Sequence, residues 1–460
     1  MQSLRHYGIV NNKTLCIPIL MIMANPTVLL ELASTISNAA LTITRHSLDT
    51  STPPPSFIPL PPGNGAANGN GAIQKQPTSE AAQKETLDAA ASLIQAATDL
   101  QILVSGPENY LKSLSYGYHD ITALAVVIEF NLAQHVPLDS EISFKELSLV
   151  SGAPLGRLER ILRLLFVRRI FHEPRPGYIA HTTASERLVT NPELTAFLGH
   201  CTHEAFPAAS RLVDSLRKYP NTEEPSQAGF NVAFGTEDPL FTFLAKNPDR
   251  FERFNQGMAG LSKSGGRSVK QVVAGFPWGE LGEATVVDVG GGNGHVSIAL
   301  AEAYPSLSFI VQDLEGAITS GAASLPASLQ DRITFEVHDM FTSQTHQGID
   351  IFYLRHILHD WPDDWAVKIL KNLVPALKPS SRIIISDSVI PPPDQLHGLH
   401  ERFVRYLDLQ MMVLHNARER TEGDFAELLR RADERLRIKK VWRGGHDAAA
   451  GTIVEAVLVQ

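Results

Sequence analysis

Cysteine is scarce in this chain of 460 residues: Cys16 and Cys201 are the only two. Two cysteines cannot build a disulfide framework or a four-ligand zinc site, and neither stands in a pattern typical of catalysis. This scarcity favours a reducing compartment, so the sequence predicts a cytoplasmic protein.

The chain also lacks an excess of positive charge. It has 40 Lys and Arg against 49 Asp and Glu, a formal net charge of −9, with an ordinary globular composition of 43% hydrophobic and 19% charged residues. A negative chain is not expected to be a dedicated binder of nucleic acid or of a membrane surface, although a local basic patch stays open. We expect neither as a partner.

Long hydrophobic runs are missing as well. Residues 15–23 are apolar, but Pro18 interrupts them and they are far shorter than the roughly 20 residues that cross a bilayer. The run is either the apolar part of a signal peptide or an over-extended N-terminus, with translation starting at Met21 or Met23. Residues 52–77 are rich in Pro, Gly and Asn, a composition that cannot bury enough surface to fold. We expect residues 1–80 to be a disordered extension and linker.

Residues 81–265 have helical patterns. Apolar residues recur every three or four positions over residues 82–104, and residues 120–133 indicate a nearly continuous apolar helix. Residues 144–166 indicate helix, glycine turn and helix, and residues 169–180 indicate strand, turn and strand, which is the winged-helix arrangement. Because apolar helices outside a catalytic core often pair with a second subunit, we expect a homodimer.

A winged helix can also bind DNA. Residues 143–190 contain eight Lys and Arg against four Asp and Glu, which permits that reading. Their second helix, however, uses Leu158, Ile161 and Leu162 among others for packing, which leaves a thin recognition face. A structural, dimer-forming module is favoured.

The glycine-rich stretch at residues 284–304 organises the rest of the chain. Residues 285–289 read as a buried strand and residues 296–303 as a helix, with Gly290, Gly291, Gly292 and Gly294 in the turn between them. Glycine permits positive φ and close approach of another molecule to the backbone. The unit therefore predicts a small ligand at a helix N-terminus.

The ligand is not a typical phosphate compound. His295 stands where a dinucleotide-binding loop needs glycine or alanine, and a Gly-Lys-Ser/Thr loop is absent. Asp288 would repel a pyrophosphate but suits an ammonium group, and Asp313, at the end of a second strand over residues 307–313, suits a ribose diol. Ammonium, ribose and a glycine loop without phosphate together predict S-adenosylmethionine.

Strands and helices alternate after the glycine loop, which predicts a parallel sheet covered on both faces. The strand over residues 333–337 leads to Asp339, placed to accept a hydrogen bond from an adenine amino group, and to Met340 and Phe341, placed to cover the ring. The predicted fold class is α/β. It is a Rossmann-like, doubly wound cofactor-binding sheet over residues 266–460, preceded by a mainly helical winged-helix dimerisation domain over residues 81–265.

A histidine-containing loop follows the next strand. That strand ends near Arg355, and a helix carrying Lys368, Leu370, Leu373 and Leu377 begins after Pro362. His359 therefore lies at the carboxyl ends of the strands, where open α/β sheets bind ligands. His356 competes for the same role, and either histidine could be an ordinary loop residue.

The segment Arg-His-Ile-Leu-His-Asp-Trp at residues 355–361 resembles the plant caffeic-acid-type and fungal polyketide (sterigmatocystin-type) O-methyltransferases, over roughly residues 85–460. The resemblance implies that His359 is the general base and that two carboxylates flank it. The first is Asp387, at a position where plant members have glutamate, and the second is Glu419. It further implies cofactor contacts from Gly290, Gly292, Asp313, Asp339, Met340 and Arg355.

This resemblance implies transfer of a methyl group from S-adenosylmethionine to a phenolic hydroxyl of an aromatic, polyketide-type metabolite, without a metal. The shape of the substrate pocket is expected to depend on residues such as Met258, Phe403, Met411 and Met412, and Met258 and Met412 are the candidates for substrate contact. The alternatives are N- or C-methylation, another reaction on the same scaffold, or a winged-helix regulator that senses the cofactor and binds DNA.

Overall fold

The computed structural model describes residues 27–50, 52–53, 55–59, 79–263, 268–392, 398–443 and 451–459. The chain forms two compact units, of which the first contains helices α2 and α3 and the second contains the sheet. The predictions for the apolar run at residues 15–23 and for most of the linker at residues 52–77 lie outside the described residues.

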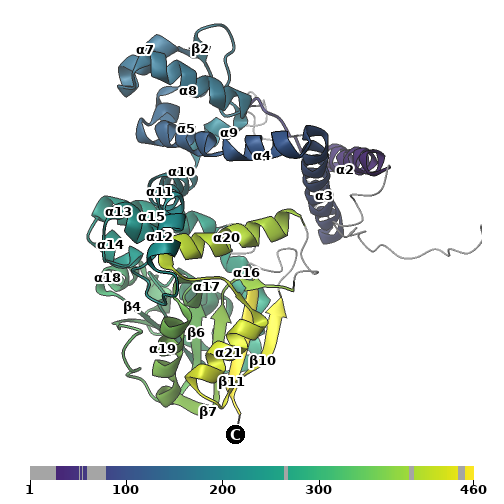
Figure 1. Ribbon diagram of the computed structural model, residues 1–460. Coiled ribbons are helices and arrows are strands. Elements are labelled where there is room, and N and C mark those ends of the chain that lie inside the picture. Colours follow the sequence, from purple (N-terminus) through teal and green to yellow (C-terminus); the bar gives the residue numbers. More distant parts are fainter. Residues whose placement is uncertain are drawn as a thin grey trace, which may run out of the picture. The chain divides into compact units, whose positions relative to one another are not determined.

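The first unit is a helix pair, drawn in purple and dark blue in Figure 1. Helix α2 (Val28–Thr50) packs against α3 (Glu80–Ser105), whose first turn is capped by the Ser79 hydroxyl, which accepts the Ala82 N–H at 3.2 Å. The helix predicted over residues 82–104 is confirmed. Residues 28–50 were expected to lack a fold and are helical instead, because their own apolar spacing, not the proline-rich stretch after them, decides their structure.

Helix α3 is also the one described helix that passes a length and composition test for crossing a membrane. The qualifying segment is Ala81–Ser105, of which only 6% is buried. Four of its large apolar side chains, Leu87, Ile94, Leu103 and Val104, are exposed in a single chain.

A further helical region follows. Most of helix α4 (Pro107–Ser115) belongs to the first unit, which runs to Ser113, and α5 (Tyr118–Glu129) and α6 (Leu132–His135) belong to the second. A single helix was predicted over residues 120–133, and this prediction was wrong. Asn131, with φ of 49°, adopts the left-handed conformation that asparagine tolerates, and this turn ends α5 before the apolar pattern ends.

Two helices joined at a glycine turn follow. Helix α7 (Phe144–Ser151) starts with a capping box and ends at Gly152, whose φ is 74°, and α8 (Leu155–Val167) comes next. The predicted hairpin over residues 169–180 is reduced to one bridge between His172 and Ala180. Strand β2 (Tyr178–Ile179) instead pairs with β1 (Ile142–Ser143), just before α7.

Several short helices connect this region to the sheet. They are α9 (Thr183–Thr190), α10 (Pro192–His200), the π-helix Cys201–Ala205, α11 (Phe206–Ser210), α12 (Leu212–Lys218), α13 (Gly229–Phe234), α14 (Leu240–Ala245), α15 (Pro248–Leu261) and α16 (Val269–Gly275).

The sheet has seven strands in the order β10-β11-β7-β6-β3-β4-β5 (Figure 1). The five strands from β7 to β5 are parallel, while β11 runs antiparallel to β7 and β10 antiparallel to β11. Their bounds are β3 (Ala284–Val289), β4 (Leu307–Asp313), β5 (Ile333–Val337), β6 (Ile349–Arg355), β7 (Leu377–Ser386), β10 (Leu436–Arg443) and β11 (Thr452–Leu458). The strands predicted over residues 285–289, 307–313 and 333–337 are confirmed.

Helices cover both faces of this sheet. Alternate residues of the central strands point to opposite sides, so Val287 packs under α19 (Asp363–Leu373) and α21 (Glu422–Ala432), and Val286 packs under α16 and α17 (His295–Ala303). Helix α18 (Glu315–Ser324) joins the second face. The predicted α/β doubly wound fold with a helical N-terminal region is confirmed.

One helix prediction in this region extended too far. The helix after Pro362 ends at Leu373, a short 3-10 turn spans Val374–Ala376, and Leu377 is already the first residue of β7. Pro375 lacks the N–H that an α-helix needs, so the helical pattern cannot reach Leu377.

Candidate active site

The candidate site lies where the parallel strands β3, β4, β6 and β7 end. Each of these strands runs into a loop that carries predicted site residues, and parallel strands place such loops at one edge of the sheet. A further segment reaches the same edge from the end of helix α20 (Leu399–His415) and strand β9 (Arg420–Thr421), which pairs with β8 (Val389–Ile390).

The glycine loop after β3 depends on left-handed backbone. Gly290, Gly292 and Gly294 have φ of 69°, 60° and 75°. A Cβ on Gly290 would lie 2.4 Å from Cδ1 of Ile357, so the loop must be bare there to pack against the histidine loop. A Cβ on Gly292 would meet no described atom within 4 Å, so this side of the loop is open to a ligand.

Asp288 lies beneath this loop. Its carboxylate is 2% exposed and accepts a hydrogen bond of 2.6 Å from the Ser297 hydroxyl. Burial raises the pKa of Asp288 to about 6, although the Ser297 hydrogen bond and the charge of Arg355 oppose the rise. The side chain therefore supports the loop from below, and its contact with an ammonium group stays a prediction.

Asp313 is tied to the same loop at the end of β4. One carboxylate oxygen accepts the Gly292 N–H at 2.8 Å and the other accepts the Leu314 N–H at 2.7 Å. Burial raises the pKa of Asp313, and these two N–H groups oppose the rise. The carboxylate is held beside the open face of Gly292, where a ribose diol would have to lie to be gripped.

The segment after β5 places an aromatic cluster at this edge. Asp339 accepts the Phe341 N–H at 2.9 Å, and the half-buried Met340 packs on the sheet core. The Phe341 ring lies 4.6 Å from Trp361 and 5.1 Å from Trp365, both edge to face. The two tryptophans were not predicted to belong to the site.

His359 lies in a short 3-10 turn, Leu358–Asp360, and is 5% exposed. Its Nδ1 lies 3.0 Å from Oε1 of Glu419, whose side chain is fully buried, and its Nε2 lies 3.6 Å from Oδ1 of Asp360. Burial by itself lowers the pKa of His359, but the carboxylates of Asp360 and Glu419 outweigh it and raise the pKa to about 9.

Asp387 holds the backbone of the histidine loop. Its two carboxylate oxygens accept the Ile357 N–H at 3.3 Å and the His359 N–H at 3.2 Å. Burial raises the pKa of Asp387, and the charge of His359 opposes the rise. Aspartate, which is one methylene shorter than the glutamate of plant members, thus hydrogen-bonds to the main chain of the histidine loop. It acts on the imidazole of His359 through its charge.

The fold also gathers a set of ligand-type side chains that the sequence analysis did not find. His356, whose φ of 52° is left-handed, has its ring 5.3 Å from that of His359. Ligand atoms of His356, His359 and Asp387 all lie within 4.8 Å of one another. Helix α19 and strand β7 separate Asp387 from the two histidines in sequence, so spacing alone could not reveal the set.

Two further ionisable residues were missed. Oδ1 of Asp360 lies 3.6 Å from Nε2 of His415 as well as from Nε2 of His359. Burial and then the charge of His359 lower the pKa of His415 to about 3. Asp360 directly follows His359 in sequence, and His415 lies between Met412 and Glu419, which was the available signal.

Arg420 connects the two halves of the site. Its buried guanidinium donates to the carbonyls of Leu358 at 2.5 Å and Trp361 at 2.8 Å, and it also binds Asp363. The segment that carries Glu419 is therefore fixed directly to the turn that carries His359.

The two predicted substrate residues lie on helices next to this edge. Met258 is half-buried on α15, one turn after Phe254, whose ring lies 5.8 Å from that of Phe241. Phe241 in turn lies 5.2 Å from the His415 ring. Met412 is half-buried on α20, three residues before His415. No described contact joins either methionine to His359.

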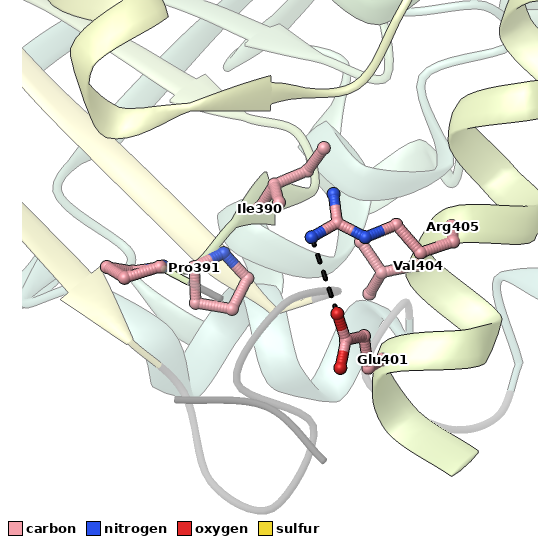
Figure 2. A pocket seen from close by; sticks show the side chains of 6 residues that line it. Ile390, Pro391, Glu401, Val404 and Arg405 are labelled. Carbon is pink, nitrogen blue, oxygen red and sulfur yellow. Dashed lines mark hydrogen bonds and ion pairs between the residues drawn. The ribbon is translucent and has the colours of Figure 1, made fainter. Parts of the chain in front are cut away.

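A separate shallow hollow lies between β8 and the start of α20 (Figure 2). Ile390, Pro391, Pro392 and Val404 line it, together with the ion pair of Glu401 and Arg405 at 3.5 Å. It contains none of the predicted site residues.

A doubly wound sheet with a glycine turn after β3 and a carboxylate at the end of β4 is typical of folds that bind a nucleoside cofactor, among them the class I S-adenosylmethionine-dependent methyltransferases. Residues 211–433 match the O-methyltransferase domain family. "O-methyltransferase bik3" of Gibberella fujikuroi is 36% identical over 79% of this chain and 79% of its own length. The "Chlorophenol O-methyltransferase" of Trichoderma longibrachiatum is 36% identical over 76% of each chain.

Among solved structures, that of LepI in complex with S-adenosylmethionine has a TM-score of 0.68 at 26% identity, over 81% of this chain and 94% of the other. The chain belongs to the S-adenosylmethionine-dependent O-methyltransferases. It transfers the methyl group of that cofactor to an oxygen atom of a small secondary metabolite. The predicted family, O-methyltransferase activity and cofactor are confirmed.

Proposed function

We propose that the methyl acceptor is a phenolic hydroxyl of an aromatic, polyketide-type metabolite and that His359 is the base that removes its proton. The buried pair of His359 Nδ1 and Glu419 Oε1, 3.0 Å apart at the cofactor edge of the sheet, carries this proposal. A phenol has a pKa near 10, so only about one molecule in a thousand is ionised at neutral pH. The relative named for chlorophenol supports the choice of a phenol.

Each residue of the site has a part in this reaction. Glu419 fixes the tautomer of His359 by accepting its Nδ1–H, which directs Nε2 to the acceptor hydroxyl. Asp387 positions the loop through its backbone N–H groups. Bound S-adenosylmethionine supplies the electrophilic methyl group, and alignment of oxygen, carbon and sulfur supplies most of the remaining acceleration. The residues that would hold the cofactor are Asp288, Gly290, Gly292, Asp313, Asp339, Met340 and Arg355.

A panel assay tests the acceptor class. Labelled cofactor incubated with phenols, anilines and carbon acids of matched size should label the phenols at least about tenfold faster. Dialysis against EDTA beforehand should leave the rate unchanged, because the proton transfer to His359 needs no metal. Faster labelling of anilines or carbon acids would reject the phenol, and loss of activity in EDTA would assign His356, His359 and Asp387 to a metal.

The pH dependence tests the base. Because the pKa of His359 is raised to about 9, the residue still holds a proton at neutral pH and cannot accept another. We expect kcat/KM to rise with pH up to about 9 and to fall again where the free phenol ionises near pH 10. In Glu419→Gln the rising limb should move to lower pH, since a carboxylate that raises the pKa is gone. A wild-type rise centred at the ordinary histidine pKa near 6.5 would reject this assignment.

We also propose that the enzyme is a cytoplasmic homodimer without a nucleic-acid or membrane partner. We divide the chain into an extension over residues 1–80, a dimer-forming part over residues 81–265 and a cofactor-binding part over residues 266–460. The support is the exposed apolar surface of α3, where Leu87 is 58%, Ile94 46% and Val104 70% exposed.

Light scattering after gel filtration tests the dimer. The wild-type chain should elute with twice the mass of one chain, because pairing would cover the apolar face of α3. Ile94→Glu should shift the protein towards the monomer, whereas Leu314→Glu, at an exposed leucine before α18, should not. A wild-type monomer at micromolar concentration would contradict the proposal.

A further inference from the structure

A second cluster of polar side chains lies at the end of α10. His200 is 2% exposed, and its Nδ1 lies 3.2 Å from Oε2 of Glu204 in the π-helix Cys201–Ala205. Glu204 is fully buried and also binds the guanidinium groups of Arg250 and Arg253 on α15. A π-helical turn is rare and is frequently found at a functional site. The cluster is therefore a candidate for a part in binding.

The charges of this cluster determine which nitrogen of His200 carries the proton. Burial raises the pKa of Glu204, but the hydrogen bond from His200 and the nearby positive charges outweigh it, and the pKa is lowered. The carboxylate is therefore ionised, and the two guanidinium groups already balance its charge. A neutral His200 then donates its Nδ1–H to Glu204, which leaves the lone pair on Nε2. Within the described part of the chain, no group forms a hydrogen bond with this Nε2.

Ring contacts connect His200 to the proposed base. The His200 ring lies 5.1 Å from that of Phe254, and the Phe254 ring lies 5.8 Å from that of Phe241. Phe241 lies 5.2 Å from His415, whose pKa is lowered by burial and also by the charge of His200. His415 in turn lies 3.6 Å from the same oxygen of Asp360 as the base does. These rings suit the flat body of an aromatic acceptor that reaches from the base towards His200.

Two glycines hold α10 firmly against α15. A Cβ on Gly199 would lie 2.7 Å from Cδ of Arg253, and a Cβ on Gly257 would lie 2.8 Å from Cα of Phe197. The two helices therefore approach each other closely, and His200 at the end of α10 has a fixed position relative to the rings on α15.

We infer that His200 is a specificity-determining residue, whose Nε2 accepts a hydrogen bond from a second, free hydroxyl of the acceptor while the first hydroxyl is methylated. This inference rests on the proposed function, because the first hydroxyl has to lie at His359. A methyl ether has no proton to donate, so Nε2 distinguishes a free hydroxyl from a methylated one. The preferred acceptor is therefore an aromatic diol, and the enzyme methylates only one of its hydroxyls.

The test uses the full chain and diols with different spacings of their oxygen atoms: resorcinol, 2,7-dihydroxynaphthalene and 4,4′-dihydroxybiphenyl. Each is compared with its mono-ol and its monomethyl ether. For at least one spacing, kcat/KM of the diol should exceed both others at least about fivefold, mainly through KM, which is more than the factor of about two expected from two equivalent hydroxyls. With excess cofactor the monomethyl ether should accumulate, as read by mass spectrometry.

Two substitutions of His200 separate recognition from packing. His200→Asn keeps an N–H for Glu204 but has no group in place of Nε2, so the diol should lose its advantage and the dimethyl ether should form. His200→Gln, whose amide oxygen can take the place of Nε2, should keep part of the preference. The control is His181→Asn, at a buried histidine whose two nitrogens each lie 3.0 Å from a protein oxygen, Ser185 Oγ and Val136 O. It should leave the preference as in the wild type.

Equal rates for diol, mono-ol and ether at every spacing in the wild type would overturn the inference. A diol preference that remains in His200→Asn would overturn it too, as would a loss in that variant that is equal for all acceptors. If His200→Asn does not fold, the wild-type comparison of diol with ether decides. If no phenol is methylated, the proposed function fails; if mono-ols and ethers are methylated as fast as diols, only this inference fails.

Discussion

Replacement of His359 by alanine is expected to lower kcat for phenol methylation by about 10²–10⁴-fold, the usual contribution of a positioned acid–base group. The loss follows from the distances around the ring. Nδ1 lies 3.0 Å from Oε1 of the buried Glu419, which holds the ring in place, and alanine removes both the ring and this contact. Cofactor affinity should stay within about twofold, because the predicted cofactor contacts, apart from Arg355 at the end of β6, come from other loops. Rapid-quench turnover and calorimetric titration measure the two quantities separately.

His356→Ala is the matched control for this variant. His356 is the competing candidate for the base, and its ring lies 5.3 Å from that of His359. The variant therefore also removes one histidine from the same loop. We expect a reduction in kcat of less than about tenfold. Thermal unfolding checks that the variant, with alanine at a backbone of positive φ, is still folded. A larger loss in His356→Ala than in His359→Ala would exchange the two assignments.

The sheet and its loops could be predicted from the sequence because local composition determines them. Strands β3, β4 and β6 are buried on both faces and are therefore almost continuously apolar, and each ends at a glycine, a carboxylate or a charged residue. This pattern places Gly290, Asp313 and Arg355 at one edge without any knowledge of packing. The candidate site could be located for the same reason.

The contacts inside the site could not be predicted in this way. Sequence places Asp387 near His359, but it does not say that the carboxylate accepts backbone N–H groups of the histidine loop. It does not say either that Oδ1 of Asp360 lies 3.6 Å from Nε2 of both His359 and His415. His415 stands at the end of α20, far from Asp360 in sequence. Such contacts depend on side-chain directions that only the packed fold sets.

Element ends were lost where one residue overrides a longer pattern. Asn131 ends α5 by its left-handed conformation, and Pro375 ends the helical pattern before β7, although apolar residues continue on both sides. Helix α2 was missed for the opposite reason: the proline- and glycine-rich stretch after it dominated the composition of the first 80 residues. For α5 and for the helix before β7, the backbone conformation of one residue outweighs the average hydrophobic pattern of its neighbours. For α2, the average composition of the first 80 residues hid a local helical pattern.

Replacement of Gly292 by alanine is expected to weaken binding of S-adenosylmethionine by about 10- to 100-fold, which corresponds to roughly 1.4–2.8 kcal/mol. The added methyl group would meet no described atom within 4 Å, so it should not disturb the packing of the loop. It would instead project from the open face beside Asp313, where the cofactor has to approach the bare backbone. Calorimetric titration with the cofactor measures the change.

Gly348→Ala separates this effect from backbone strain. Gly348 has a φ of 66°, close to the 60° of Gly292, and its added Cβ would likewise meet no described atom within 4 Å. It precedes β6 and so lies at the opposite edge of the same sheet. Both variants should lose similar stability, about 1–2 kcal/mol for an L-residue in the left-handed region, because the strain is the same. Only Gly292→Ala should lose cofactor affinity, and an equal loss in both variants would mean that the loop does not hold the cofactor at its open face.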